Sequence, residues 1–218
     1  TRCLSDWSSD VCSSDLERYN EVWWFYCSAG STTIDRYVVF NYAETLWYYG
    51  TMARTAWIDT SLFNAPMAAT YSNNLVLHET GTDDNETNTP LPINAFIQSS
   101  EIDLADGHQF MFVWRILPDI TFDNSTATNP SVTMSLLPLT NSGSGYNVNS
   151  APTANHSVAG VSYGSVIRSV ALPIEQFTGY LYTRVRGRQM AIRVESTELG
   201  VAWQLGSPRF DTRPDGRR

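Results

Sequence analysis

The sequence contains no lysine, so each of its 14 basic residues is an arginine. An Arg side chain keeps its charge across the ordinary pH range, and its planar fork fits carboxylates, phosphates and aromatic faces. Charged residues are also scarce, at 17% of the chain against about 25% in typical soluble domains. Asn, Ser and Thr supply the polar surface instead, and this mixture favours strands and long polar loops over long solvated helices.

Cysteine is rare as well. The three cysteines, Cys3, Cys12 and Cys27, are odd in number and lack CxxC spacing. This pattern predicts neither a disulfide framework nor a zinc site. The sequence also lacks a run of 18 apolar residues, so we expect no membrane-spanning helix.

The net charge of −8 is unevenly distributed along the chain. Residues 1–183 hold 6 Arg against 18 Asp and Glu, a balance of −12, whereas residues 184–218 hold 8 Arg against 4, a balance of +4. An acidic body argues against general affinity for the nucleic-acid backbone. The basic C-terminal end leaves room for a local anionic partner.

Residues 1–16 are unlike the rest of the chain. Ser-Ser-Asp occurs at 8–10 and again at 13–15, without hydrophobic periodicity, and the tract resembles translated adapter sequence. We therefore expect residues 1–16 to be a non-native, disordered tail outside the fold, and the chain to be the C-terminal remainder of a longer protein. Residues 17–218 then form one β-rich domain.

Aromatic and β-branched residues predict four short strands near the start of this domain, at 21–28, 34–42, 45–49 and 55–58. Four antiparallel strands in about 40 residues match the size of one β-propeller blade. Only one such unit is visible, so the sequence does not demonstrate a repeat.

Further strands are predicted along the remainder, and helix signals are weak. Residues 93–102 and 109–116 are interpreted as a hairpin joined across Asp106-Gly107, and the apolar faces of 109–116 indicate an inner strand. Residues 79–92 and 140–165 are interpreted as polar loops, and 206–218 as a polar end. The other predicted strands are 75–78, 131–139, 166–172, 179–186, 189–196 and 201–205. The predicted fold class is therefore all-β with antiparallel sheets.

No motif indicates catalysis or metal binding. His78, His108 and His156 show no metal-ligand spacing, and no serine lies in a GxSxG context. The acids at 83–86 resemble a calcium loop, but they lack its sixth-position Gly and twelfth-position Glu, which favours a solvated loop. We expect no enzyme, no cofactor and no metal. Paired carboxylates for glycoside cleavage stay open, because Asp103, Asp106, Asp119 and Asp123 offer several pairs.

Aromatic residues could form a sugar-binding platform, but such runs more often pack between sheets. Core packing is therefore favoured, and a carbohydrate-binding or glycoside-active β protein is the alternative function. The residues concerned are Trp23, Trp24, Phe25, Tyr26, Trp47, Tyr48 and Tyr49.

Arginines cluster in the segment 182–188, Tyr-Thr-Arg-Val-Arg-Gly-Arg. In an extended strand Arg184, Arg186 and Arg188 share one face, and like charges on one face are costly without partners. They either dock on an acidic subunit surface or DNA phosphates, or pair locally with Glu195, Glu198 or Asp211. The candidate docking residues are Arg184, Arg186, Arg188 and Arg193.

Several phrases together resemble one family. They are residues 20–26 (NEVWWFY), 35–42 (DRYVVFNY), 107–115 (GHQF…VWR), 182–190 (YTRVRGRQM) and 203–218 (WQLGSPR…DGRR). They resemble the C-terminal part of tailed-bacteriophage virion proteins described as packaged-DNA stabilisation or tail hub and nozzle proteins, over about residues 20–218.

This resemblance implies a β-propeller-containing structural subunit in a homo-oligomeric ring around the DNA exit channel. The implied partners are other tail or head–tail connector subunits, with a passing contact to packaged DNA. The implied location is the virion, after synthesis in the bacterial host cytoplasm. An acidic lumen repels phosphate and lets DNA slide, which agrees with the acidic body.

Overall fold

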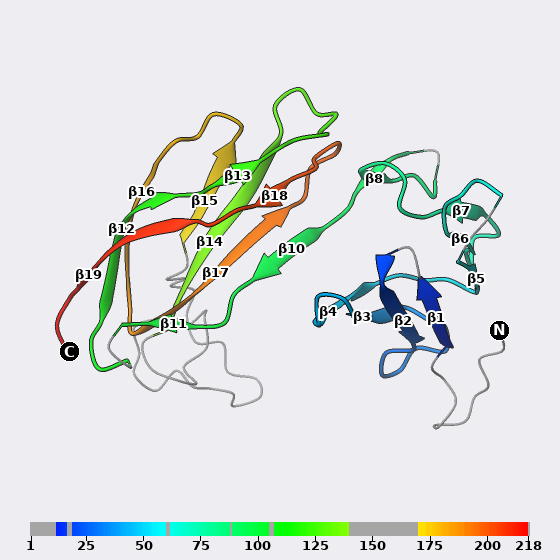
Figure 1. Cartoon of the computed structure of the whole chain (residues 1–218), viewed down its shortest axis with the longest axis horizontal. Helices are drawn as coiled ribbons and strands as arrows, with labels where there is room; N and C mark the ends of the chain where they lie inside the picture. The colour runs from blue at the N-terminus through cyan, green and yellow to red at the C-terminus, as the bar shows by residue number, and fades with distance from the viewer. Residues whose placement is uncertain are drawn as a thin grey trace. The chain divides into compact units, whose positions relative to one another are not determined.

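The structure is a computed structural model. It describes residues 12–16, 19–59, 62–87, 89–104, 107–139 and 170–217. The described chain forms antiparallel β-sheets and contains no α-helix (Figure 1), which confirms the predicted fold class. Among the described residues there is no helix long and apolar enough to cross a membrane. Residues 1–81 and 82–218 form two compact units. The sequence had suggested one domain over 17–218.

The first unit is built on a four-stranded sheet in the order β1-β2-β3-β4. Its inner face buries Trp23, Phe25 and Val39 around Leu16, which is 1% exposed. The strands are β1 (Cys12–Leu16), β2 (Glu21–Tyr26), β3 (Arg36–Asn41) and β4 (Leu46–Thr51).

Strand β1 corrects the expectation that residues 1–16 lie outside the fold. Residues 12–16 pair with β2 in antiparallel register. The physical reason is that β2 offers an open row of backbone N–H and C=O groups, and Leu16 fills the apolar cluster beneath it. Residues 1–11 lie outside the described part of the chain.

The predicted strand at 55–58 is present but does not join this sheet. It forms β5 (Ala56–Ile58), which pairs with β6 (Met67–Ala69) and β7 (Leu75–Leu77) in a separate three-stranded sheet. Trp57 of β5 packs against the first unit's core, where its ring lies 5.7 Å from the ring of Trp23.

The turn between β2 and β3 is closed by one carboxylate. Asp35 accepts hydrogen bonds from the Ser28 hydroxyl at 2.5 Å and from the Ser28 backbone N–H at 2.7 Å. These bonds favour the ionised carboxylate and lower the pKa of Asp35.

The second unit is a two-layered β-sandwich with two small two-stranded sheets. One layer has the order β10-β17-β14-β15 with β11 beside β17, and the other has the order β16-β12-β19 (Figure 1). The first layer comprises β10 (Ala95–Gln98), β11 (Ile102–Asp103), β14 (Ser131–Leu139), β15 (Val170–Glu175) and β17 (Gln189–Ser196). The second comprises β12 (Met111–Leu117), β16 (Leu181–Gly187) and β19 (Arg209–Pro214), and the small pairs are β8 (Asp83–Asp84) with β9 (Leu91–Pro92) and β13 (Ile120–Thr121) with β18 (Gln204–Leu205).

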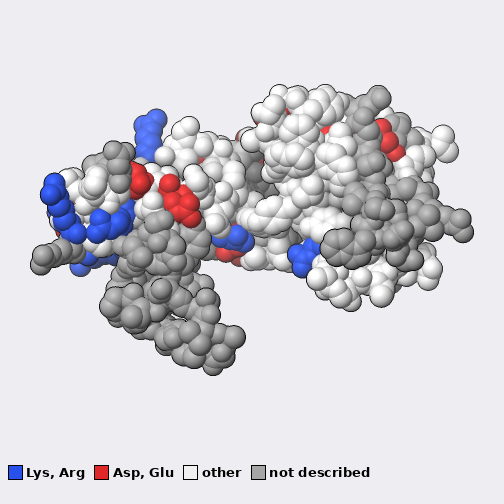
Figure 2. All heavy atoms as spheres, turned by 90° about the horizontal axis from the view of Figure 1, so that it is seen from below, with Lys and Arg blue, Asp and Glu red and all other residues white. Residues whose placement is uncertain are grey.

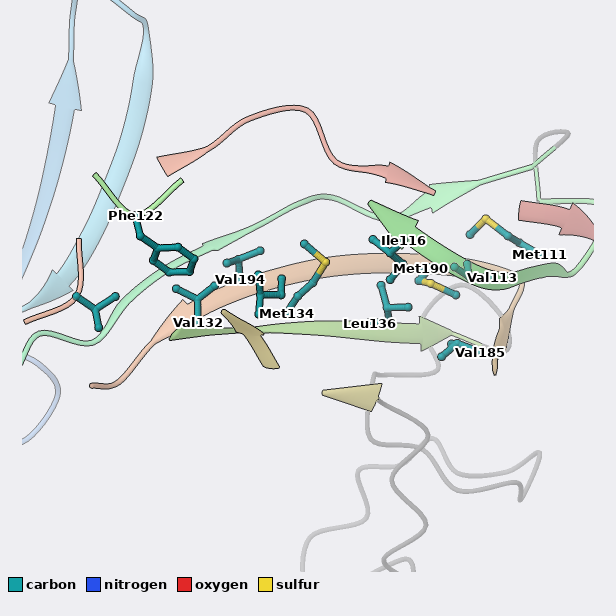
Figure 3. Close-up of a cluster of buried hydrophobic side chains, with 12 residues drawn as sticks. Met111, Val113, Ile116, Phe122, Val132, Met134, Leu136, Val185, Met190 and Val194 are labelled. Carbon is teal, nitrogen blue, oxygen red and sulfur yellow. The ribbon is translucent and has the colours of Figure 1, made fainter. Parts of the chain in front are cut away.

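Period-two patterning explains the core between these layers. Along β14, Val132, Met134 and Leu136 are buried while the residues between them are half-buried, as alternation in a strand requires. Val113 of β12 and Val194 of β17 join the same cluster. Figure 3 shows these side chains gathered between the strands of the two layers.

The predicted hairpin across residues 106 and 107 is wrong. Residues 95–98 and 102–103 pair with β17, whereas β12 pairs with β16 and β19. The two apolar faces of β12 suit the middle of a three-stranded sheet, so the inner-strand prediction is confirmed. Asp106 lies outside the described residues, as does all of the predicted loop 140–165.

Strands β16 and β17 form one nearly continuous run of chain that belongs to both layers. β16 ends at Gly187, β17 begins at Gln189, and only a bend at Arg188 separates them. The backbone N–H of Arg188 donates to the Leu139 carbonyl at 2.8 Å. A Cβ at position 187 would lie 2.9 Å from Pro138 Cβ and 2.8 Å from the Gln189 carbonyl oxygen, so only glycine fits this approach.

Candidate functional site

The outer face of the β16-β12-β19 sheet brings together cationic and aromatic side chains of the second unit. Along β16, Thr183 and Val185 are buried and Arg184 and Arg186 are exposed. We call this surface the Arg–aromatic face; it comprises Phe112, Trp114, Arg115, Tyr182, Arg184, Arg186 and Arg213.

A β-bulge in β12 sets the composition of this face. The register of β12 with both neighbours shifts between Val113 and Arg115. Val113 and Ile116 are buried, whereas the two residues between them, Trp114 and Arg115, are exposed and half-buried. A bulge adds one residue and re-aims side chains, so both face away from the core.

The middle of the face is an open depression of about 560 Å³, lined by Phe112, Trp114, Arg184 and Arg213. The register places Phe112 of β12 between Arg186 of β16 and Arg213 of β19. Figure 2 shows arginine atoms gathered at the end of the second unit where Figure 1 draws these strands. The depression therefore has apolar rings on its floor and guanidinium groups at its sides.

Two arginines of the face are paired with carboxylates of the C-terminal segment. Arg186 Nε donates to Asp215 Oδ2 at 2.6 Å, and Arg115 Nε donates to the carboxylate of Asp211. The pairing with Asp211 raises the pKa of Arg115. All four side chains are more than a third exposed, so water screens both pairs and each contributes little to stability.

Aromatic rings hold several guanidinium groups in place. The guanidinium carbon of Arg213 lies 4.8 Å from the centre of the Phe112 ring, and that of Arg115 lies 4.8 Å from the Trp114 ring. Such stacking stabilises the cation and leaves its N–H edges directed outward. The rings are thus partly covered, and the hydrogen-bond donors remain available.

Two arginines of the face lack an acidic partner. Within the described residues, Arg184 makes no hydrogen bond, ion pair or ring contact, and Arg213 contacts the Phe112 ring but pairs with no carboxylate. Both border the depression. This arrangement can bind a carboxylate or phosphate from outside, because unpaired guanidinium groups form charge-assisted, bidentate hydrogen bonds.

The four arginines proposed from the sequence do not share one surface. Arg188 lies at the bend, where Nη1 donates to the Gly107 carbonyl at 2.7 Å. Arg193 lies on β17, in the other layer of the sandwich, on the face of that layer turned away from the core. It pairs with Glu195 at 2.9 Å. Only Arg184 and Arg186 belong to the Arg–aromatic face.

Two of the acids considered as local partners of Arg184, Arg186 and Arg188 are paired with other arginines. Asp211 pairs with Arg115 and Glu195 pairs with Arg193, whereas Arg186 pairs with Asp215, which was not among the predicted acids. Sequence reasoning also missed Phe112, Trp114, Arg115 and Arg213 as members of the face. The alternation in 109–116 was visible, but the bulge and the pairing with β19 were not.

The other candidate groups do not converge. No three His, Cys, Asp or Glu side chains gather in the part of the chain that the structure describes. His78 accepts a hydrogen bond from Arg54 Nε at 3.1 Å, and His108 is exposed; His156 is outside the described residues. Asp83 accepts the Gly200 N–H at 2.7 Å, which gives it a structural partner.

The aromatic residues of the first unit divide between the two faces of their sheet. Trp23 and Phe25 are buried, which agrees with the favoured core packing. Trp24 lies on the opposite face, where its ring centre is 5.7 Å from that of Trp47 of β4. Trp47 is 62% exposed and Tyr49 is 67% exposed, so this second aromatic face is open to solvent.

Comparison of the chain with protein-family models and with curated proteins gave no match.

Proposed function

We propose that the chain is a non-enzymatic structural subunit of a tailed bacteriophage tail or head–tail connector, forming part of a ring around the DNA exit channel. It acts in the virion after synthesis in the host cytoplasm, and its partners are copies of itself and other connector subunits. The observation that carries the proposal is the combination of large exposed apolar side chains on sheet faces with unpaired arginines. Exposed patches of this kind mark protein–protein contacts.

The sequence phrases that resemble packaged-DNA stabilisation and tail hub proteins support the same proposal. The propeller part of it rests on the β1–β4 sheet, whose four antiparallel strands have the size of one blade. The structural role is supported by the openness of the Arg–aromatic face, whose depression lies on an exposed sheet surface.

The test is to express the full-length gene together with its genomic neighbours and examine the product by electron microscopy. We expect a ring-shaped homo-oligomer that copurifies with portal or adaptor proteins. Monomers at all concentrations, without affinity for portal or adaptor proteins, would contradict the proposal.

A carbohydrate-binding role is a second candidate, and the second aromatic face is the observation that favours it. Trp24, Phe40, Trp47 and Tyr49 lie on one side of their sheet, with the Phe40 and Trp47 ring centres 4.7 Å apart. Flat exposed rings bind the apolar faces of sugars. A glycan array decides between the two roles, with Trp47→Ala expected to abolish any binding and Phe177→Ala, at an exposed site elsewhere, expected to leave it unchanged.

A further inference from the structure

We propose that the Arg–aromatic face of one copy binds carboxylates from residues 55–114 of a second copy of this chain. The inference deepens the proposed function, because it names the contact between neighbouring subunits of the ring, and it rests on that proposal for its biological setting.

The receptor side is defined by groups with unused binding capacity. Arg184 has no partner among the described residues, and Arg213 is held on the Phe112 ring without an acid. Trp114 and Tyr182 beside them are 40% and 70% exposed. Two pre-positioned guanidinium groups over an apolar floor favour a partner that brings carboxylates together with apolar side chains.

The occupant is identified by charge complementarity within the chain. No Arg lies between Arg54 and Arg115, and residues 55–114 carry only acidic charges. The same segment exposes the large apolar side chains of Leu91, Ile93 and Ile97. Its acids are Asp59, Glu79, Asp83, Asp84, Glu86, Glu101, Asp103 and Asp106.

The contact joins two different surfaces, so it is heterologous. A basic, aromatic patch on one copy meets an acidic segment on the next, so a pair of copies retains one free acidic segment and one free basic patch. Contacts of this type generate rings when the rotation between subunits closes. A second copy is favoured over a nucleic acid because the exposed rings already carry stacked cations, which compete with base stacking.

The absence of lysine permits a direct test. Arg184→Lys introduces an amine at the depression, and the chain otherwise has an amine only at its N-terminus. A carbodiimide joins an amine only to a carboxylate in direct contact with it. Mixing ¹⁴N- and ¹⁵N-labelled chains before the reaction separates cross-links between copies from cross-links within one copy by mass.

The expected result is a mixed-isotope cross-link from position 184 to an acid within 55–114. Arg193→Lys is the matched control, because Glu195 lies beside it on the same strand and should give a cross-link within one copy. Cross-links from position 184 only within one copy, or only to acids outside 55–114, would overturn the inference. The absence of any cross-link from position 184, in an experiment where the control reacts, would also overturn it.

Charge reversal gives a second readout that does not depend on cross-linking. The Arg184→Glu, Arg213→Glu chain should self-associate about tenfold or more weakly in sedimentation equilibrium, and the wild-type association should weaken with added salt. Because both side chains point away from the core, the circular dichroism spectrum should be unchanged. Replacing the cross-linked acid by Arg in the reversed chain should restore association; unchanged association after reversal would overturn the inference.

Three further outcomes separate this inference from DNA binding and from the proposed function. A 20-nucleotide single-stranded DNA that binds the face, in a chain that forms no cross-link between copies, would overturn the second-copy assignment. If the full-length protein with Arg184→Glu and Arg213→Glu still forms rings normally, the proposed contact between copies is wrong, while the structural role stands. Cross-links between copies in a protein without affinity for portal or adaptor would support the contact and contradict the role.

Discussion

Gly200 joins three separate segments of the second unit through its backbone. Its N–H donates to Asp83 at 2.7 Å, and its carbonyl accepts the N–H groups of Thr126 and Ala127 at 2.8 and 3.0 Å. Its φ of +72° lies in the left-handed region, and a Cβ there would meet Thr126 Oγ1 at 2.6 Å. Gly200 is therefore constrained both by conformation and by space.

We predict that Gly200→Ala lowers the free energy of unfolding by more than about 1 kcal/mol, measured by urea denaturation. Gly216→Ala is the matched control, because Gly216 has a φ of +76° but nothing within 4 Å of the added Cβ. The difference between the two variants isolates the steric part. Equal losses in the two variants would contradict the close contact at Gly200.

At the scale of elements, strand β19 holds together a sheet that the sequence did not reveal. It pairs with β12 along six residues of β12's length, places Phe210 against the core and supplies Asp211 to Arg115. Truncation before Ser207 should therefore destabilise the second unit by at least about 1.5 kcal/mol, the lower end of the range for burying one large apolar side chain, and expose the edge of β12.

Urea denaturation and amide hydrogen exchange at Val113 measure this loss. Arg209→Ala is the control, since Arg209 is an exposed residue of the same strand whose replacement keeps the backbone pairing. A truncated chain with the wild-type unfolding midpoint would show that β19 contributes nothing.

How far the sequence predicts these elements depends on how strongly each is patterned. Alternation in 131–139 correctly predicted β14 and its buried residues Val132, Met134 and Leu136. Residues 209–214 alternate charged and polar groups with a single Phe, so they were interpreted as a polar end. Pairing partners were least predictable, because β12 and β17 lie in different layers and nothing local specifies that choice.

The candidate site shows the same limit. Extended geometry correctly placed Arg184 and Arg186 on one face, because alternation along a single strand is a local property. It could not predict that Arg193 lies in the other layer, or that β19 adds Arg213 to the face. A site built from three strands needs the sheet order, and that order is set by packing over long sequence separations.

At the scale of the whole molecule, the chain consists of two units with separate cores. We predict that a fragment of residues 82–218 folds alone and keeps the amide NMR shifts of the same residues in the full chain. A fragment starting at 111 loses β10 and β11 and is the control, expected to lose shift dispersion. A collapsed spectrum for 82–218 would show that its core depends on residues 1–81.

The uninterrupted passage of β16 into β17 also constrains how this sequence can evolve. Inserting or deleting one residue between 181 and 196 would reverse the inward and outward positions of one layer relative to the other. Met190 and Val194 would then face solvent, while Arg193 and Glu195 would enter the core. Natural relatives should therefore differ in length at the loops but keep this 16-residue run free of single-residue gaps.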